Sequence, residues 1–495
     1  MSLIVCKFGG TSVASPERIQ MVAKKLIAKK QAGHQVVAVV SAMGKTTDEL
    51  VGLAASLNDN PPAREMDRLL STGEQVSMTL LAMAIEARGY KAMSFTGRQA
   101  GIETDGTHAK AKIVKVHNER IMEALNRGVI AVVAGFQGID ANGDITTLGR
   151  GGSDTTAVAG AHGPDADVCE IYSDVESDPS VECIMRGVKA MNAFQPDVII
   201  AIGGGSSMDT AKAIAVEATH PGTAWDYNCH TAGPTEQTLP ILAISTTAGT
   251  GSQTTPCAVI TKTSAKDKSA IWNKNIFPRA AIVDPEVTLS LPASVTAQTG
   301  FDAFCHNFEA YLSVNTNPLV ECMALDAIRI IAAYLPRALA DGSDLEARSQ
   351  MAWADTLGGL TNASAGVTLP HGLGMQIGGH CPHVTHGQSL AVFYPAFTRY
   401  TYPAAEHKFA TVGRIFEPSL ERESDAVAAE RSCDAIDCFL KRIGLWINFR
   451  ELNVTKEDIR EIADCGQVLG DYANNPRVAT IPEMYELLMS CYDRK

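Results

Sequence analysis

DVIIAIGGGSSMDTAK, residues 197–212, decides how the middle of this chain folds. An uninterrupted apolar run precedes the triplet Gly203–Gly205, and an alanine-rich stretch with helical spacing follows it. Such apolar runs are typical of strands buried in a parallel sheet. We therefore predict a strand, a tight turn and a helix that Ser206 or Ser207 caps. Backbone N–H groups at this helix start suit a pyrophosphate, although the glycine spacing is not the GxGxxG fingerprint.

The same alternation of strand-like apolar runs and helical segments continues on both sides of this segment. It runs from Met1 to about Val175 and from Pro179 to about Pro292. This predicts α/β regions with mostly parallel sheets covered by helices on both faces. After Leu291 only amphipathic helices follow, which predicts an all-α C-terminal domain. The predicted parts are residues 1–175, 176–291 and 292–495.

A dense set of potential metal ligands lies in the helical region. Asp302 and His306 are four residues apart, so on a helix both side chains lie on one face and can share one ion. The segment Leu369–Gly387 adds four of the twelve histidines of the chain. Imidazole and carboxylate without thiolate suit Fe(II), Zn or Mn(II). The four histidines of that segment are His371, His380, His383 and His386.

The N-terminal region carries polar loops of a different kind. KFGGTSV at Lys7–Val13 lies between a strand and a helix, so it is either a phosphate-binding turn, in which Lys7 neutralises phosphoryl oxygens, or a plain tight turn. TTLGRGGSDTTA at Thr146–Ala157 is a second phosphate-binding candidate, and STGEQVS at Ser71–Ser77 places Glu74 near a helix start.

These strings together make residues 1–175 similar to aspartate kinase, of the amino-acid kinase family. The resemblance implies that Lys7 stabilises a transferred phosphoryl group from ATP with Mg²⁺, and that L-aspartate is the acceptor. It breaks after Val175, where ESDPSVECIM replaces the family's continuing ATP site. The remaining residues that the resemblance places around aspartate and phosphate are Thr11, Ser12, Ser41, Glu74, Arg150, Ser153 and Asp154.

From Ser173 to Lys495 the chain resembles the iron-containing alcohol dehydrogenases. GGGSSMD, TTAGTGS, FPRAAIVDPEV, DAFCH and the PHG/THG pair match in order. The resemblance implies Fe(II), with Zn possible, held by Asp302, His306, His371 and His386. It also implies that NAD or NADP is bound by Gly203, Gly204, Gly205, Ser206, Asp209, Thr246, Thr247 and Lys268. For Asp209 two roles stay open: a structural hydrogen bond, or a position facing the nicotinamide.

Three departures from this second pattern affect the chemistry. Met375 stands where many members have a histidine near the nicotinamide, so either His380 or His383 is the catalytic proton relay or the relay differs here. Gln253 replaces a frequent glutamate. The family's first βαβα segment, which chooses NAD over NADP, is not recognisable, and the two patterns join within Ser173–Val175.

The composition limits which partners and which cellular location we expect. The formal charge of −13 argues against nucleic acid or an anionic membrane as a partner. No signal peptide or membrane span is recognisable, and the twelve cysteines form no CxxC pair, so we expect a cytoplasmic protein. We also expect a homo-oligomer.

The leading hypothesis is a metal-dependent alcohol dehydrogenase that acts on a small alcohol or aldehyde. The alternatives are aspartate kinase activity, or a fusion of the two without catalysis. In the last case the truncated sheets would expose unpaired edges and apolar faces and so promote aggregation.

Overall fold

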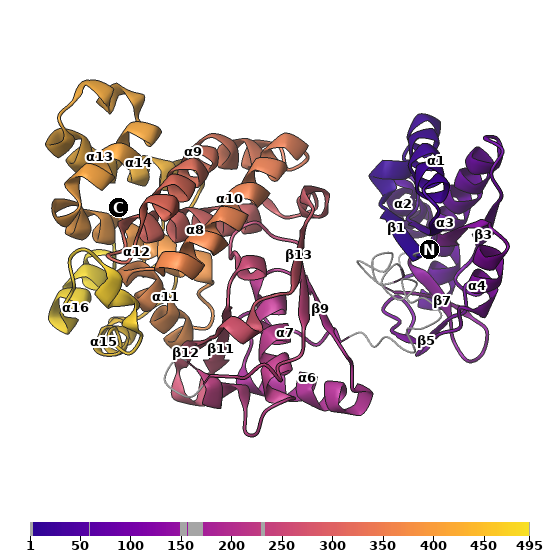
Figure 1. Ribbon diagram of the computed structural model, residues 1–495, viewed down its shortest axis with the longest axis horizontal. Helices are drawn as coiled ribbons and strands as arrows, with labels where there is room; N and C mark the ends of the chain where they lie inside the picture. Colours follow the sequence, from indigo (N-terminus) through magenta and orange to yellow (C-terminus); the bar gives the residue numbers. More distant parts are fainter. Residues whose placement is uncertain (1–2, 59, 149–155, 157–171, 229–232, 495) are drawn as a thin grey trace. The chain divides into compact units, whose positions relative to one another are not determined.

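The chain folds into two compact units, residues 1–171 and 172–495. The computed structural model describes residues 3–58, 60–148, 156, 172–228 and 233–494 (Figure 1). Each unit has its own hydrophobic core, and each is described by itself below.

A four-stranded parallel sheet forms the centre of the first unit. Alternate residues of its strands point to opposite faces, so Val36, Ala38 and Val40 pack under α1 and α3 while Val37 and Val39 pack under α4. The predicted covering on both faces is therefore correct for this sheet. In sheet order the strands are β1 (Leu3–Phe8), β2 (Gln35–Val40), β6 (Ile130–Ala134) and β3 (Ala92–Phe95), and the helices are α1 (Pro16–Gln31), α3 (Ala63–Glu86) and α4 (Glu119–Asn126).

Several features of this unit were not predicted, β3 and α4 among them. α2 (Thr46–Leu57) exposes Leu53 and Leu57 to solvent. A second, mostly antiparallel sheet is built from strands of three or four residues, which are too short to show an alternating pattern. Its order is β5 (Ile113–Val116), β4 (Ile102–Thr104), β7 (Gln137–Ile139) and β8 (Ile145–Thr147).

The second unit opens with a smaller parallel sheet that is covered on one face. Met208 and Ala211 of α7 pack on Ala201 and Ala243. On the opposite face Ile200, Ile202 and Ile282 keep 41%, 41% and 56% of their surface exposed. The prediction of covering on both faces is wrong here among the described residues. The sheet order is β13 (Ala280–Val283), β10 (Ile241–Ser245) and β9 (Ile199–Gly203), and α7 spans Gly205–Glu217.

An antiparallel hairpin and a further helix complete this α/β region. The hairpin was not predicted; it pairs β11 (Cys257–Lys262) with β12 (Asp267–Trp272). Helix α6 (Val181–Phe194) packs with α7 on the apolar side of β11.

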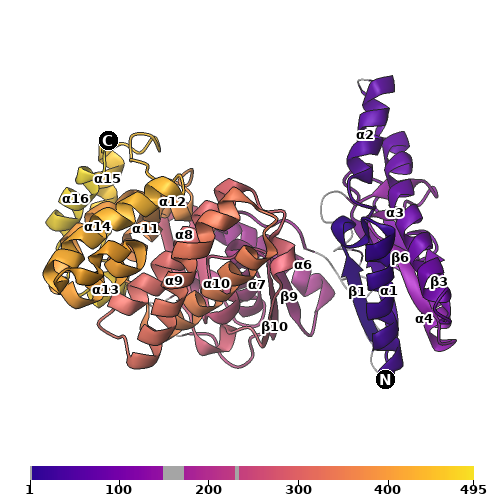
Figure 2. The same ribbon diagram turned by 90° about the horizontal axis from the view of Figure 1, so that it is seen from above.

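The rest of the second unit is helical, which confirms the predicted fold class (Figure 2). The aromatic rings of Phe301, Phe304, Phe308 and Tyr394 form its core. No helix among the described residues is long and apolar enough to cross a bilayer. The helices are α8 (Ala293–Leu312), α9 (Pro318–Ala340), α10 (Leu345–Ala365), α11 (Leu369–His380), α12 (His386–Thr401), α13 (Glu406–Phe416), α14 (Asp425–Arg442), α15 (Lys456–Asp464) and α16 (Ile481–Ser490).

The residues at the join of the two sequence patterns pack on the second unit. The Tyr172 hydroxyl donates to the Cys183 carbonyl at 3.3 Å. Arg186 of α6 donates to Asp174 at 2.7 Å and to Glu176 at 2.6 Å. These contacts anchor the string that both patterns share to α6.

Candidate metal centre

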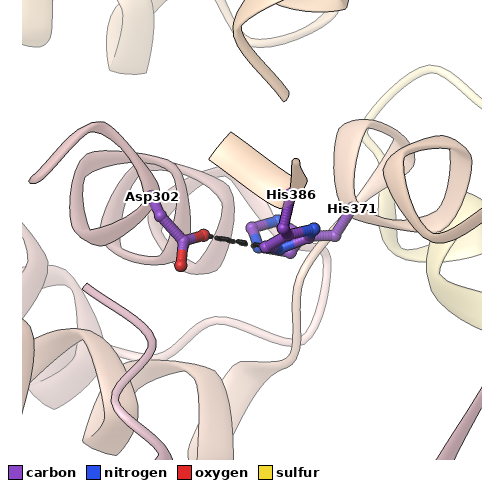
Figure 3. Close-up of side chains that lie close together, drawn as sticks. All are labelled: Asp302, His371 and His386. Atoms are coloured by element: carbon purple, nitrogen blue, oxygen red, sulfur yellow. Dashed lines mark ion pairs between the residues drawn. The ribbon is translucent and has the colours of Figure 1, made fainter. Parts of the chain in front are cut away.

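Three helices bring the predicted metal ligands together. Asp302 and His306 lie one turn apart on the buried face of α8. His371 lies in the first turn of α11, and His386 is the first residue of α12. Figure 3 shows His371 and His386 side by side opposite the Asp302 carboxylate. The two histidines are 15 residues apart in sequence, and the turn between α11 and α12 places both rings on one side of α8.

The distances define a compact group of ligand atoms. Asp302 Oδ1 lies 3.5 Å from His371 Nε2, 3.6 Å from His386 Nε2 and 3.6 Å from His306 Nδ1. One ligand atom from each of Asp302, His371 and His386 lies within 4.8 Å of the others. His306 lies beside this group, and its Nδ1 is also 3.2 Å from the Gly249 carbonyl oxygen.

Unpaired polar atoms at this point fit a bound cation. Asp302 Oδ1, His371 Nε2 and His386 Nδ1 are buried and have no hydrogen-bond partner among the described residues. Buried polar atoms without partners are costly, so they usually coordinate an ion or bind water. A set of one carboxylate and imidazoles suits a divalent transition metal. The residues present therefore fit the expected metal.

The charged side chains of this group shift one another's pKa values. Burial alone would raise the pKa of Asp302, but the neighbouring histidines lower it to about 2. Burial lowers the pKa of His386 to about 3. Burial would also lower the pKa of His371, yet Glu309 and Asp302 raise it to about 10. Without a metal, His371 is thus the proton carrier of the group, and metal binding must displace that proton.

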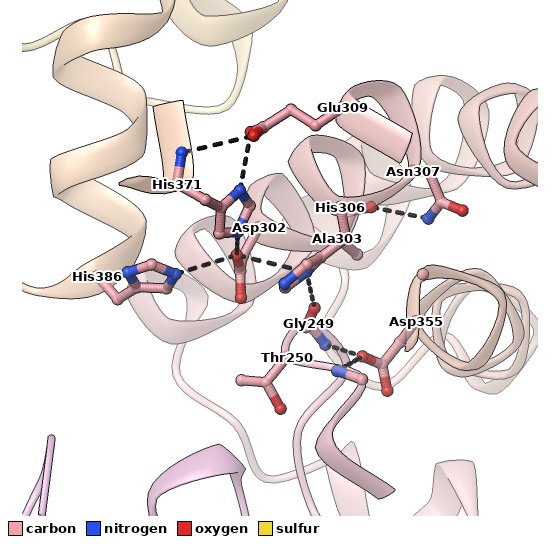
Figure 4. Close-up of polar contacts among 12 residues, drawn as sticks. Gly249, Thr250, Asp302, Ala303, His306, Asn307, Glu309, Asp355, His371 and His386 are labelled. Atoms are coloured by element: carbon pink, nitrogen blue, oxygen red, sulfur yellow. Dashed lines mark hydrogen bonds and ion pairs between the residues drawn. The ribbon is translucent and has the colours of Figure 1, made fainter. Parts of the chain in front are cut away.

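Glu309 is a functional residue that the sequence reasoning missed. It is fully buried, and its Oε1 lies 2.8 Å from His371 Nδ1 (Figure 4). Its Oε2 accepts from the backbone N–H of Thr368 at 2.9 Å. A signal was present, because Asp302, His306 and Glu309 follow the i, i+4, i+7 spacing of one helical face.

Asp355 of α10 was missed as well. Its Oδ1 accepts from the backbone N–H groups of Gly249 and Gly251, at 2.7 and 2.8 Å (Figure 4). Its Oδ2 accepts from Gln253 Nε2 at 2.7 Å. Burial raises the pKa of this carboxyl to about 7. Asp355 therefore holds the loop whose Gly249 carbonyl contacts His306, and this loop is the one expected to bind the cofactor. No local feature of the sequence predicted this role of Asp355.

The glycine turn of the predicted nucleotide site has the expected strand–turn–helix form. β9 ends at Gly203, which adopts a φ of +152° that favours glycine. The N-cap is Gly204, which has no side chain that could cap the helix, so the prediction that Ser206 or Ser207 caps α7 is wrong. The helix starts early enough to place both serines inside its first turn, where Ser206 Oγ accepts from the Asp178 N–H.

The second loop packs closely on this turn. A Cβ at Gly204 would lie 3.1 Å from Thr247 atoms, and one at Gly205 would lie 2.7 Å from Thr250. The Thr246 N–H donates to the Gly203 carbonyl at 2.9 Å. The glycines are thus needed for the approach of the two loops.

Two other residues expected to bind the cofactor have protein partners. Asp209 is buried; its Oδ1 accepts from Ser252 Oγ at 2.7 Å and its Oδ2 from the Val259 N–H at 3.0 Å. Of the two roles left open, these contacts support the structural one. Lys268 is buried too, and its Nζ lies 2.6 Å from Asp178 Oδ1.

The two histidines expected to relay protons lie outside the group of ligand atoms. His380 Nδ1 is 2.9 Å from the Gln376 carbonyl oxygen, and His383 Nε2 is 2.9 Å from that of Leu452. Met375, which stands at the family's usual relay position, is buried.

In the first unit the structure describes only part of the expected kinase site. Lys7 extends from β1 so that its Nζ lies 3.8 Å from the position of a Cβ on Gly9. Glu74 lies in the middle of α3, not near a helix start, and its Oε1 accepts from the Ala42 N–H at 3.2 Å. Burial raises its pKa to about 7. Arg150, Ser153 and Asp154 lie outside the described residues.

Comparison with known proteins matches each unit to a different family. Residues 155–285 match the model of iron-containing alcohol dehydrogenase, and residues 296–492 match the C-terminal model of that family. The NAD-dependent methanol dehydrogenase of Bacillus methanolicus is 35% identical over 318 residues, which are 64% of this chain and 83% of that protein. The chain belongs to the iron-containing alcohol dehydrogenase family.

Solved structures of iron-containing alcohol dehydrogenases and their relatives agree with this assignment. A 1,3-propanediol oxidoreductase superimposes with a TM-score of 0.61 and 27% identity, covering 84% of this chain and 96% of that one. The alcohol dehydrogenase from Oenococcus oeni gives 0.64 and 28%, covering 69% and 88%.

The first unit is similar to the amino acid kinase family. That family's model matches residues 2–182, so it overlaps the dehydrogenase match at the join. The aspartokinase of Bacillus sp. (strain MGA3) is 61% identical over 175 residues, which are 35% of this chain and 43% of that protein. The chain therefore spans less than half of that aspartokinase. The findings confirm both resemblances, within an iron-containing alcohol dehydrogenase that carries a kinase-like unit.

Proposed function

We propose that this protein transfers a hydride between a small primary alcohol, or its aldehyde, and NAD, at a centre that Asp302, His306, His371 and His386 form around Fe(II). One observation carries the proposal: one ligand atom from each of Asp302, His371 and His386 lies within 4.8 Å of the others, and Asp302 Oδ1 and His371 Nε2, 3.5 Å apart, are buried without a hydrogen-bond partner among the described residues. The relatives named methanol dehydrogenase and 1,3-propanediol oxidoreductase point to short primary alcohols.

The side chains around this centre have separate tasks in the proposed reaction. A metal ion bound there supplies a Lewis acid that lowers the pKa of an alcohol oxygen or polarises an aldehyde. Glu309 accepts from His371 Nδ1 and so presents Nε2 as a lone pair toward the centre. Asp355 fixes the Gly249–Gly251 backbone and with it the position of His306.

The cofactor would lie on the first turn of α7. The backbone N–H groups there would bind the pyrophosphate, and the helix dipole adds partial positive charge. Lys268, held by Asp178, adds a buried cation near His386, since the charges of both Lys268 and Asp178 act on that histidine. His380 and His383 remain the candidates for the proton relay. A shifted pH profile in His380→Gln or His383→Gln would identify it.

Metal content and turnover test the proposal together. The purified protein should hold about one Fe or Zn per chain and form NADH with ethanol or 1,3-propanediol. His371→Ala should lose the metal and the activity. His407→Ala is the matched control, because that histidine is exposed and pairs with Asp425 outside the centre. Full metal content in His371→Ala would refute the ligand assignment.

A second candidate function is phosphorylation of L-aspartate by ATP and Mg²⁺ in the first unit. The observation that favours it is the buried Glu74 carboxylate, whose Oε2 has no partner among the described residues. Aspartate-dependent ATP consumption that Lys7→Ala abolishes would support it. If neither this activity nor alcohol oxidation is found, the fusion without catalysis is the better description.

A further inference from the structure

The helical region contains a cavity of about 680 Å³ that is open to solvent and that neither proposed activity uses. It lies between α9, α13 and α14, and three arginines line it: Arg329, Arg414 and Arg442. Glu421 is the one acidic residue of its lining, so the wall carries two more positive than negative charges. The wall of the cavity is therefore positively charged, although the whole chain has a formal charge of −13.

The arginines differ in what holds them. Arg414 donates to the carbonyls of Leu420 and Glu423 and lies 2.8 Å from Asp425 Oδ1, so it is a fixed part of the wall. Arg329 and Arg442 are exposed to solvent, and their side chains make no hydrogen bond or ion pair within the described part of the chain. Two unpaired guanidinium groups beside a fixed third form a site that attracts carboxylate or phosphate oxygens, because each guanidinium can bind such a group with two N–H donors.

The apolar part of the wall includes two aromatic rings. Phe416 and Phe439 line the cavity with their ring centroids 4.9 Å apart, and both rings pack on Phe304 of α8. Phe304 lies between Asp302 and His306 in sequence and belongs to the aromatic core. The cavity thus lies one aromatic layer from the helix that carries two of the predicted metal ligands.

We propose that this cavity binds a small organic dianion, whose charged group lies between Arg329 and Arg442 and whose apolar part contacts Phe416 and Phe439. A purely inorganic anion would make no contact with Phe416 and Phe439. A neutral organic molecule would not offset the excess positive charge of the arginines. A ligand that carries both parts satisfies the two walls of the same cavity.

Cys438 provides a direct readout, because this exposed thiol also lines the cavity. Alkylation of Cys438 by uncharged iodoacetamide is followed by peptide mass spectrometry on the full-length protein, with Cys322 as the internal exposed control. Phenyl phosphate and phthalate are the probes and distinguish a phosphate from a dicarboxylate ligand. Either should slow alkylation of Cys438 in a saturable way and leave Cys322 unaffected, whereas inorganic phosphate and benzyl alcohol should protect much more weakly.

Arg329→Gln with Arg442→Gln should weaken the probe's apparent affinity by about tenfold or more, as expected for lost hydrogen bonds between charged groups. Arg422→Gln, an exposed arginine nearby that does not line the cavity, should leave it unchanged. Absence of saturable protection, or equal protection in the double variant, would overturn the proposal. Equal protection by inorganic phosphate would overturn the aromatic contact. None of these readouts depends on the proposed dehydrogenase activity.

Discussion

Glu309 Oε1 lies 2.8 Å from Nδ1 of His371, and both side chains are buried. This contact fixes which ring nitrogen of His371 faces Asp302. A carboxylate behind a ligating histidine typically improves metal affinity by one to two orders of magnitude.

Glu309→Gln should therefore weaken metal affinity roughly 10–100-fold, because the amide is a poorer acceptor for the His371 N–H. Competition with a chelator of known affinity measures the change. Tyr394→Phe is the control, since that hydroxyl is 3.5 Å from Glu309 Oε1 and its loss should have a much smaller effect. Unchanged metal affinity in Glu309→Gln, with normal thermal stability, would contradict the orienting role.

Two substitutions of Asp355 distinguish the contribution of its hydrogen bonds to stability from the contribution of its charge. Asp355→Ala leaves two backbone N–H groups without an acceptor and should cost roughly 2–4 kcal/mol of unfolding free energy. Asp355→Asn should cost under about 1 kcal/mol, because Gln253 Oε1, now unpaired, can turn to accept from the new amide. Urea denaturation compares the variants, and equal losses in both would show that the charge matters.

The buried Glu74 makes the first unit sensitive to pH. Burial raises the pKa of this carboxyl from 4.5 to about 7, so the folded state favours the protonated form. The sign follows: this contribution to stability is complete below pH 4.5 and is lost as the pH rises through 7. The change is on the order of 3 kcal/mol.

Glu74→Gln should remove this dependence. The test is the urea midpoint of the first unit at several pH values, read by exchange labelling of the β2 peptide at one fixed labelling pH. If the variant and the parent protein keep the same slope between pH 5 and 7, Glu74 is not the titrating group.

The uncovered face of the β13-β10-β9 sheet predicts self-association. Ile200, Ile202 and Ile282 form an exposed apolar stripe, and stripes of this kind promote aggregation. Ile200→Lys with Ile282→Glu should lower the concentration-dependent light scattering. Val314→Lys, which changes an even more exposed apolar residue outside the sheet, should not. No difference between the variants would mean that this face is not the source of association.

Much of the fold could be predicted because its signals are local. Continuous apolar runs such as 199–203 and 241–245 form strands, and amphipathic periodicity marks the helices after Leu291. Strands β3, β4, β5, β7 and β8 were missed because they have only three or four residues and no measurable period. The β11–β12 hairpin was missed because its pairing depends on residues across the turn.

The candidate metal centre, like the fold, could be predicted only in part. The residues that can bind a metal could be predicted from the sequence, because carboxylate and imidazole chemistry and the spacing of Asp302 and His306 on a helix are local properties. The folded structure was needed to show that His371 and His386 face Asp302 while His380 and His383 bond to backbone carbonyls. It also decided the roles of Glu309 and Asp355, because burial and long-range hydrogen bonds depend on how helices pack, and spacing along the chain does not specify that packing.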